Sequence, residues 1–200
     1  MGRRSGLKEF KLLLPVTLFL LISLTGCAAV QVRESGQQQF NFTRIKSIVI
    51  LPFVENYRSS TDSLFVPIKT TDNVYESADI ISMDMFDAGI KVVDRMFLEK
   101  VLSEQKLSLS GLMEKQDYRK IGNMVNADAI LWGTIQTSKL IGQRSCTLSV
   151  RLIDVETGTV IYTSINEKKD IWAGLDTSSM KGELIAETGK KLKEFLMKHR

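Results

Sequence analysis

The spacing of apolar and polar residues predicts a chain of alternating strands and amphipathic helices. Residues 47–51 are Ser47 followed by the aliphatic run Ile48-Val49-Ile50-Leu51, which Pro52 closes, and this is typical of a buried strand. Residues 74–85 instead carry their apolar positions at helical spacing, and Gly89 follows as a C-terminal cap. The full prediction, in chain order, is a strand at 47–51, a helix at 74–85, a strand at 90–93, helices at 95–106 and from 117, strands at 129–136, 147–154 and 160–165, and a helix at 180–199. The order βαβααβββα implies an α/β fold with a single mixed sheet flanked by helices.

Two apolar stretches fall inside segments that this pattern assigns to loops. A long connection at 54–71 contains one of them, and the last loop contains the other. An exposed apolar loop tip often marks a partner-binding site. The alternative is that the first stretch folds back as an edge strand or covers the sheet. The candidate partner contacts are Leu64, Phe65, Val66, Ile68 and Trp172.

The N-terminal segment has the parts of a bacterial signal peptide. Four Lys or Arg residues within 3–11 precede an apolar run from Leu12 to Leu24. That run of about 13 residues is too short for a stable transmembrane helix, which needs roughly 20. It ends in Leu24-Thr25-Gly26-Cys27, which resembles the lipobox of bacterial lipoproteins. The resemblance implies cleavage before Cys27 and acylation of this residue, and two or three acyl chains form a stable anchor. The alternative is an uncleaved signal anchor with an incidental cysteine.

The signal peptide accounts for most of the basic character of the chain. The whole sequence has a formal net charge of +4 and a pI near 9.0. Residues 1–26 hold four basic residues and one acid, so their removal lowers the net charge to +1. The basic charge that would support a nucleic-acid partner is therefore largely absent from the mature chain. We expect residues 27–44 to hold the lipidated cysteine and a short polar tether, and residues 45–200 to form a periplasmic domain.

The side chains that enzymes use are scarce in this sequence. The one histidine, His199, lies next to the C-terminus, and one thiol, Cys146, remains once Cys27 is acylated. These numbers exclude a Cys/His zinc cluster and a disulfide framework. We expect Cys146 to be buried and unreactive, the alternative being an intermolecular disulfide in the periplasm. Asp94 is expected to cap the helix that begins at Arg95. We predict no enzymatic activity, and no catalytic residue, metal or cofactor.

Four motifs in the predicted domain resemble the CsgG family, which includes curli secretion lipoproteins. They are Ile48-Val49-Ile50-Leu51-Pro52-Phe53; Val92-Val93-Asp94-Arg95 with Leu98 and Leu102-Ser103-Glu104-Gln105; Ala127-Asp128-Ala129-Ile130-Leu131-Trp132-Gly133; and Leu152-Ile153-Asp154-Val155-Glu156-Thr157-Gly158. The resemblance implies the periplasmic fold of that family, similar to anticodon-binding domains. Curli channels add membrane-spanning hairpins, and such a hairpin needs roughly twenty residues. The connections at 138–144 and 167–179 are too short for one, so we expect no pore.

These observations lead to a functional expectation. We expect a lipid-anchored accessory or assembly factor for an envelope export or surface-assembly complex, acting through protein partners as a monomer or a homo-oligomer. Ala28, rather than Asp, after the cysteine favours the outer membrane, with the domain facing the periplasm, by analogy with lipoprotein sorting. The alternative is an activator of a periplasmic cell-wall synthase, a penicillin-binding protein. LpoB, which has a similar fold without pore hairpins, acts in this way and carries a longer tether.

Overall fold

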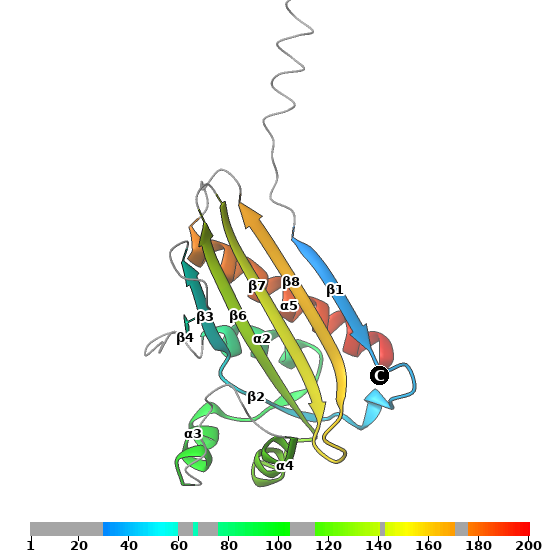
Figure 1. Cartoon of the computed structure of the whole chain (residues 1–200). Coiled ribbons are helices and arrows are strands. Elements are labelled where there is room, and N and C mark those ends of the chain that lie inside the picture. Colours follow the sequence, from blue (N-terminus) through cyan, green and yellow to red (C-terminus); the bar gives the residue numbers. More distant parts are fainter. Residues whose placement is uncertain (1–29, 60–65, 68–75, 105–114, 141–142, 171–175) are drawn as a thin grey trace, which may run out of the picture.

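The computed structural model describes residues 30–59, 66–67, 76–104, 115–140, 143–170 and 176–200. In these residues eight strands form one mixed sheet with helices packed against it (Figure 1). The elements are β1 Gln31–Gly36, η1 Phe42–Arg44, β2 Ser47–Ile50, β3 Val54–Ser59, β4 Val66–Pro67, α2 Glu76–Asp87, β5 Lys91–Val92, α3 Arg95–Glu104, α4 Lys115–Met124, β6 Ala129–Leu140, β7 Gln143–Asp154, β8 Val160–Asp170 and α5 Thr177–His199. This architecture confirms the predicted α/β fold with a single mixed sheet.

Apart from three additional strands, the elements follow the predicted order βαβααβββα. That order runs β2, α2, β5, α3, α4, β6, β7, β8 and α5. Across the sheet the strands lie in the order β1-β8-β7-β6-β2-β5, and β3 pairs with β6 beyond the part that pairs with β2. The long strands β6, β7 and β8 form an antiparallel meander, whereas β2 and β3 lie parallel to β6.

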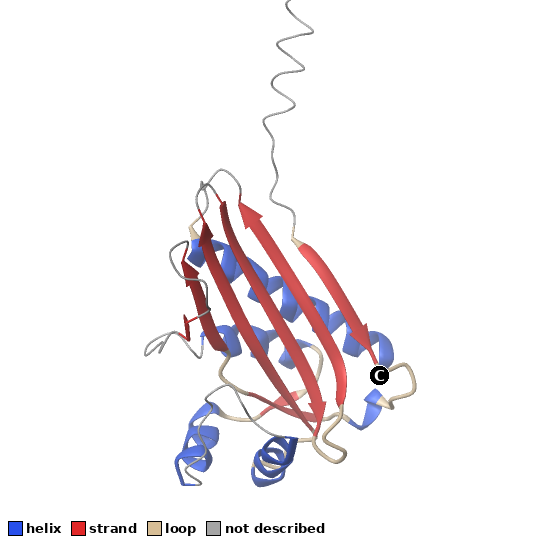
Figure 2. Cartoon of the chain, in the orientation of Figure 1, coloured by secondary structure: helices blue, strands red, loops and turns tan. Residues whose placement is uncertain are grey.

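The aliphatic run that contains β2 contributes to two hydrophobic cores. Its side chains alternate between the two faces of the sheet. Ile48 and Ile50 belong to the core that α2 and α5 cover, whereas Val49 and Leu51 belong to the core that α3 and α4 cover. All four are buried, which explains why no polar residue interrupts the run. Figure 2 shows α3 and α4 near the end of the sheet where β7 leads into β8.

Most of the predicted tether is part of the folded domain. Gln31–Gly36 forms β1, which pairs antiparallel with residues 162–167 of β8. The short turn η1 follows and buries Phe42. The expectation of a polar tether is therefore wrong from residue 31 onward. The strand has no apolar alternation because its residues, QVRESG, lie mostly exposed at the sheet edge, and only pairing with β8 identifies it.

The predicted long connection at 54–71 also contains strands. Val54–Ser59 forms β3, which lies parallel to residues 134–139 of β6. Val66–Pro67 forms β4, which pairs antiparallel with β3. The assignment of 54–59 to a loop is therefore wrong, and the edge-strand alternative is confirmed for Val66 and Pro67. The mixed sequence VENYRS carries no strong strand signal, so its long partner β6 decides its conformation.

Candidate functional site

Many of the residues singled out by the sequence cannot be placed. Outside the described residues lie Cys27, Leu64, Phe65, Ile68 and Trp172. The lipid anchor and most of the loop contacts therefore stay predictions. Val66 lies in β4, where it pairs with Tyr57 of β3. Within the described ranges, no helix has both the length and the apolar character needed to cross a bilayer.

Asp94 caps α3, as the sequence predicts. Its Oδ1 accepts a hydrogen bond from the backbone N–H of Phe97 at 3.0 Å, which satisfies one of the free donors at the helix start. Arg95 pairs with Glu99 one turn further on, at 3.0 Å, and with Asp79 of α2 at 3.8 Å. These exposed pairs contribute little to stability. The strand-to-helix turn thus has a structural role, and it joins α3 to α2.

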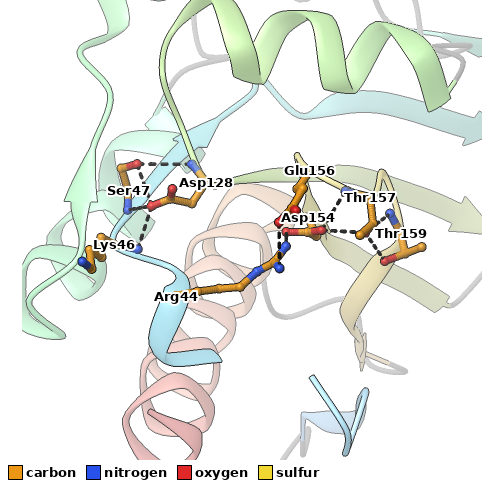
Figure 3. Close-up of polar contacts among 8 residues, drawn as sticks. All are labelled: Arg44, Lys46, Ser47, Asp128, Asp154, Glu156, Thr157 and Thr159. Carbon is orange, nitrogen blue, oxygen red and sulfur yellow. Dashed lines mark hydrogen bonds and ion pairs between the residues drawn. The ribbon is translucent and has the colours of Figure 1, made fainter. Parts of the chain in front are cut away.

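A polar cluster ties the β7–β8 turn to η1 (Figure 3). Asp154 is 1% exposed, and its carboxylate accepts hydrogen bonds from Thr157 N at 2.9 Å and from Thr157 Oγ1 at 2.5 Å. Arg44 forms an ion pair with the same carboxylate and a second ion pair with Glu156 at 2.9 Å. The cluster therefore joins two segments that are 110 residues apart in the chain.

The donors around Asp154 stabilise its charged form. Burial alone would raise the pKa of the Asp154 carboxyl, but the hydrogen bonds from Thr157 and Arg44 outweigh it and hold the pKa below its usual value. The hydrogen bond to Asp154 raises the pKa of Arg44 in turn. Gly158 completes the turn with a φ of 65°, a conformation that favours glycine. The sequence identifies this turn, but nothing in it pairs Arg44 with so distant an acid.

Asp128 forms a second cluster where β2 and β6 begin (Figure 3). Its Oδ2 accepts hydrogen bonds from Lys46 N and Ser47 N, both at 2.8 Å, and from Ser47 Oγ at 3.0 Å. In return, Asp128 N donates to Ser47 O at 3.0 Å. These contacts hold the first residues of β2 in parallel register with β6. Both clusters satisfy their carboxylates with donors from the chain, so they fix this end of the sheet.

Two ion pairs connect the N-terminal half of α5 to strands β3 and β8. Lys181 of α5 pairs with Glu55 of β3, and Glu183 of α5 pairs with Lys168 of β8. Lys168 is 6% exposed, and the side chains of Lys181 and Glu55 are 16% and 13% exposed. Removing one partner of a buried pair is costly because the other charge stays desolvated. These pairs therefore specify how the N-terminal half of α5 lies on the sheet.

Cys146 of β7 is fully buried, which confirms its predicted location. Burial raises the pKa of its thiol to about 12, although the positive charge of Lys181 partly opposes this. The thiol stays protonated at neutral pH, whereas the thiolate is the reactive form. An intermolecular disulfide needs an accessible sulfur, so the structure does not support that alternative.

His199 lies at the end of α5 and contacts the residue one turn before it. The ring of His199 stacks on Phe195 with centroids 4.3 Å apart, and its Nδ1 lies 2.8 Å from the Phe195 carbonyl oxygen. It therefore packs at the C-terminal end of α5. Among the described residues, no three His, Cys, Asp or Glu side chains gather as metal ligands do.

The helices α2 and α3 carry exposed apolar side chains that sequence reasoning missed. On α2, Met83 and Phe86 are 71% and 60% exposed. At the start of α3, Met96 and Phe97 are 78% and 48% exposed. The signal was present, because Met83 and Phe86 fall off the apolar face that the helical spacing assigns to the core. We call these four residues the α2–α3 apolar group, which names exposed side chains on two helices that cover opposite faces of the sheet.

Comparison with known proteins shows a likeness in structure. The sequence matches no protein-family model and no curated protein. The chain is similar to lipoprotein GNA1162 from Neisseria meningitidis, at 14% identity and a TM-score of 0.49 over 74% of this chain and 98% of that chain. It is similar to a PelC dodecamer from Paraburkholderia phytofirmans, at 16% identity and a TM-score of 0.43 over 82% and 98% of the two chains. It is also similar to the LpoB C-terminal domain from Escherichia coli, at 17% identity and a TM-score of 0.43 over 61% and 81% of the two chains. A likeness at this level does not assign a function, and the resemblance to the CsgG family stays a prediction.

Proposed function

We propose that the chain is a non-enzymatic lipoprotein of the outer membrane that serves as an accessory or assembly factor for an envelope export or surface-assembly complex. The observation that carries the proposal is the position of Leu24-Thr25-Gly26-Cys27, directly behind a basic region and an apolar run. The first strand of the domain, β1, begins only four residues after Cys27. Acyl chains on Cys27 therefore attach the folded domain to the bilayer almost without a spacer.

Two features support a protein partner as the ligand. The α2–α3 apolar group leaves four large side chains in solvent, and Met and Phe are both enriched in protein interfaces. The similarity of four motifs to the CsgG family supports a partner within an envelope machine. The carboxylates of Asp128 and Asp154 accept hydrogen bonds from donors of the chain itself.

Acyl labelling of cells that express the full chain tests the anchor. We expect a clickable palmitate analogue to label the wild-type protein, and Cys27→Ser to lose both the label and its association with membranes. Cys146→Ser is the matched control, since it removes the other cysteine and leaves the lipobox intact. Equal labelling of wild type and Cys27→Ser would overturn the proposal.

Crosslinking in cells identifies the partner. We expect a photoreactive residue at Met96 to capture an export or assembly component, whereas the same residue at Lys190, an exposed position of α5, captures less. The LpoB-like alternative needs a tether that reaches away from the membrane, and only three residues separate Cys27 from β1. Recovery of a penicillin-binding protein from Met96 would replace our proposal with that alternative. A stable monomer by native mass measurement in detergent would exclude a ring assembly.

A further inference from the structure

The register of the sheet shows how far the β6–β7 hairpin projects past the start of β1. Gln31, the first residue of β1, is level with Glu167 of β8, which is level with Thr147 of β7. From there β7 continues for four more residues to Gln143, which pairs with Leu140 of β6. At about 3.4 Å per residue, the hairpin projects roughly 14 Å beyond the start of β1. Figure 1 shows this end of the sheet opposite the end that carries α3 and α4.

The chain between the lipid site and the sheet spans no more than this distance. Cys27 precedes Gln31 by four residues. A fully extended chain covers at most about 3.6 Å per residue, so Cys27 lies within roughly 14 Å of Gln31. Even a straight linker therefore brings the acylated residue only level with the end of the hairpin. Any bend in the linker brings the lipid closer to the body of the sheet.

We infer that the hairpin end of the sheet, defined by Lys139, Gln143, Arg144 and Lys169, rests on the phospholipid headgroups. The inference rests on acylation of Cys27, the anchor of the proposed function. Acyl chains must lie in the hydrocarbon layer, which places Cys27 at the membrane interface. Because the linker reaches no further than the hairpin projects, the end of the hairpin lies at this interface too. Exposed Lys139 lies opposite Arg144 in the antiparallel pair, and Lys169 of β8, which pairs with Glu167 at 3.1 Å, is 51% exposed. Lipid phosphates accept hydrogen bonds from such cations.

The same geometry sets the direction in which the other end of the domain points. From Gln143 to Asp154, β7 has 12 residues, and the steps between the first and the last of them cover about 37 Å. The β7–β8 turn is therefore held far from the bilayer, and α3 lies near that end (Figure 1). Met96 and Phe97 on α3 are thus presented to proteins in the periplasm rather than to lipid.

Spin labels on the full lipidated protein test this orientation. The protein is reconstituted into vesicles of phosphatidylethanolamine and phosphatidylglycerol that contain a nickel-chelating lipid. A nitroxide is attached at Lys139→Cys or, as the matched control, at Glu156→Cys, where the native side chain is 76% exposed. Cys146 is buried and stays unlabelled. We expect headgroup nickel to enhance the relaxation of the label at 139 several-fold over the label at 156.

A longer linker tests the cause of the orientation. We expect an insertion of about ten Gly and Ser residues between Val30 and Gln31 to reduce the enhancement at 139 toward the value at 156, since it frees the domain from the surface. Equal enhancement at both labels with the native linker, or an unchanged value at 139 after the insertion, would overturn the inference. Absence of acyl label on Cys27 would instead defeat the proposed function, so the two failures are distinguishable.

Discussion

Replacing Asp154 by Asn removes the buried charge that joins η1 to the β7–β8 turn. Asn keeps the shape of the side chain and still accepts a hydrogen bond from Thr157, but it does not form an ion pair with Arg44. A hydrogen bond to a charged group contributes about 1.5–3 kcal/mol, and removing one partner of a buried pair costs about 3–5 kcal/mol. Arg44 is 35% exposed and keeps Glu156 as a partner. We therefore expect the free energy of unfolding to fall by an amount within the lower of these two ranges, about 2–3 kcal/mol.

The stability lost in Asp154→Asn depends on pH and becomes smaller in acid. The pKa of Asp154 is lower in the folded protein than its ordinary value of 3.8, so the carboxylate stabilises the fold at pH values above 3.8. As the pH falls below this value and passes through the folded-state pKa, the carboxylate takes up a proton and the stabilisation is lost. Asn does not titrate, so the difference in stability between wild type and Asp154→Asn narrows in acid.

Thermal unfolding followed by circular dichroism measures this difference. For a chain of this size, a loss of about 2–3 kcal/mol lowers Tm by roughly 5–10 °C at about pH 7. Glu156→Gln is the matched control, since it removes the other acid that contacts Arg44 from a position that is 76% exposed. We expect the control to change stability by less than about 0.5 kcal/mol. An equal loss in the two variants, or no loss in Asp154→Asn at neutral pH, would refute the reasoning.

Three further predictions follow from the packing of the sheet, α4 and α5. A thiol reagent at about pH 8 should not react with Cys146 in the folded protein and should react fully after unfolding, because the thiol is buried and its pKa is about 12; rapid labelling of the folded protein would contradict this. Gly122→Ala should lower the free energy of unfolding by about 1–3 kcal/mol, since its Cβ would overlap a buried valine, whereas Gly182→Ala, in open space on α5, should raise it by up to about 1 kcal/mol. Denaturant titration compares the two variants, and equal effects would exclude the overlap as the cause. Glu55→Leu should cost about 3 kcal/mol because it leaves Lys181 without its partner, and adding Lys181→Met should recover most of that loss; a double variant less stable than the single one would argue against coupling.

The elements with a strong local pattern were predictable, and those without one were not. The run Ile48–Leu51 predicts a strand buried on both faces. The buried face of α5 is predicted by the helical spacing of Leu184, Ile185, Leu192 and Leu196. In contrast, β1 and β3 consist largely of polar residues. Their strand conformation comes from hydrogen bonds to strands far away in the chain: β8 lies 126 to 136 residues from β1, and β6 lies 80 residues from β3.

By itself the sequence determined the order of the main elements, the buried state of Cys146, the cap at Asp94 and the prediction of a lipid anchor at Cys27. These depend on residues close together in the chain, whose periodicity, turn preference or motif is visible locally. Only the tertiary structure decided that Arg44 pairs with Asp154, that Asp128 holds the start of β2, and that the predicted tether joins the sheet. Such contacts connect distant segments, and no local pattern specifies which of many similar polar residues will meet.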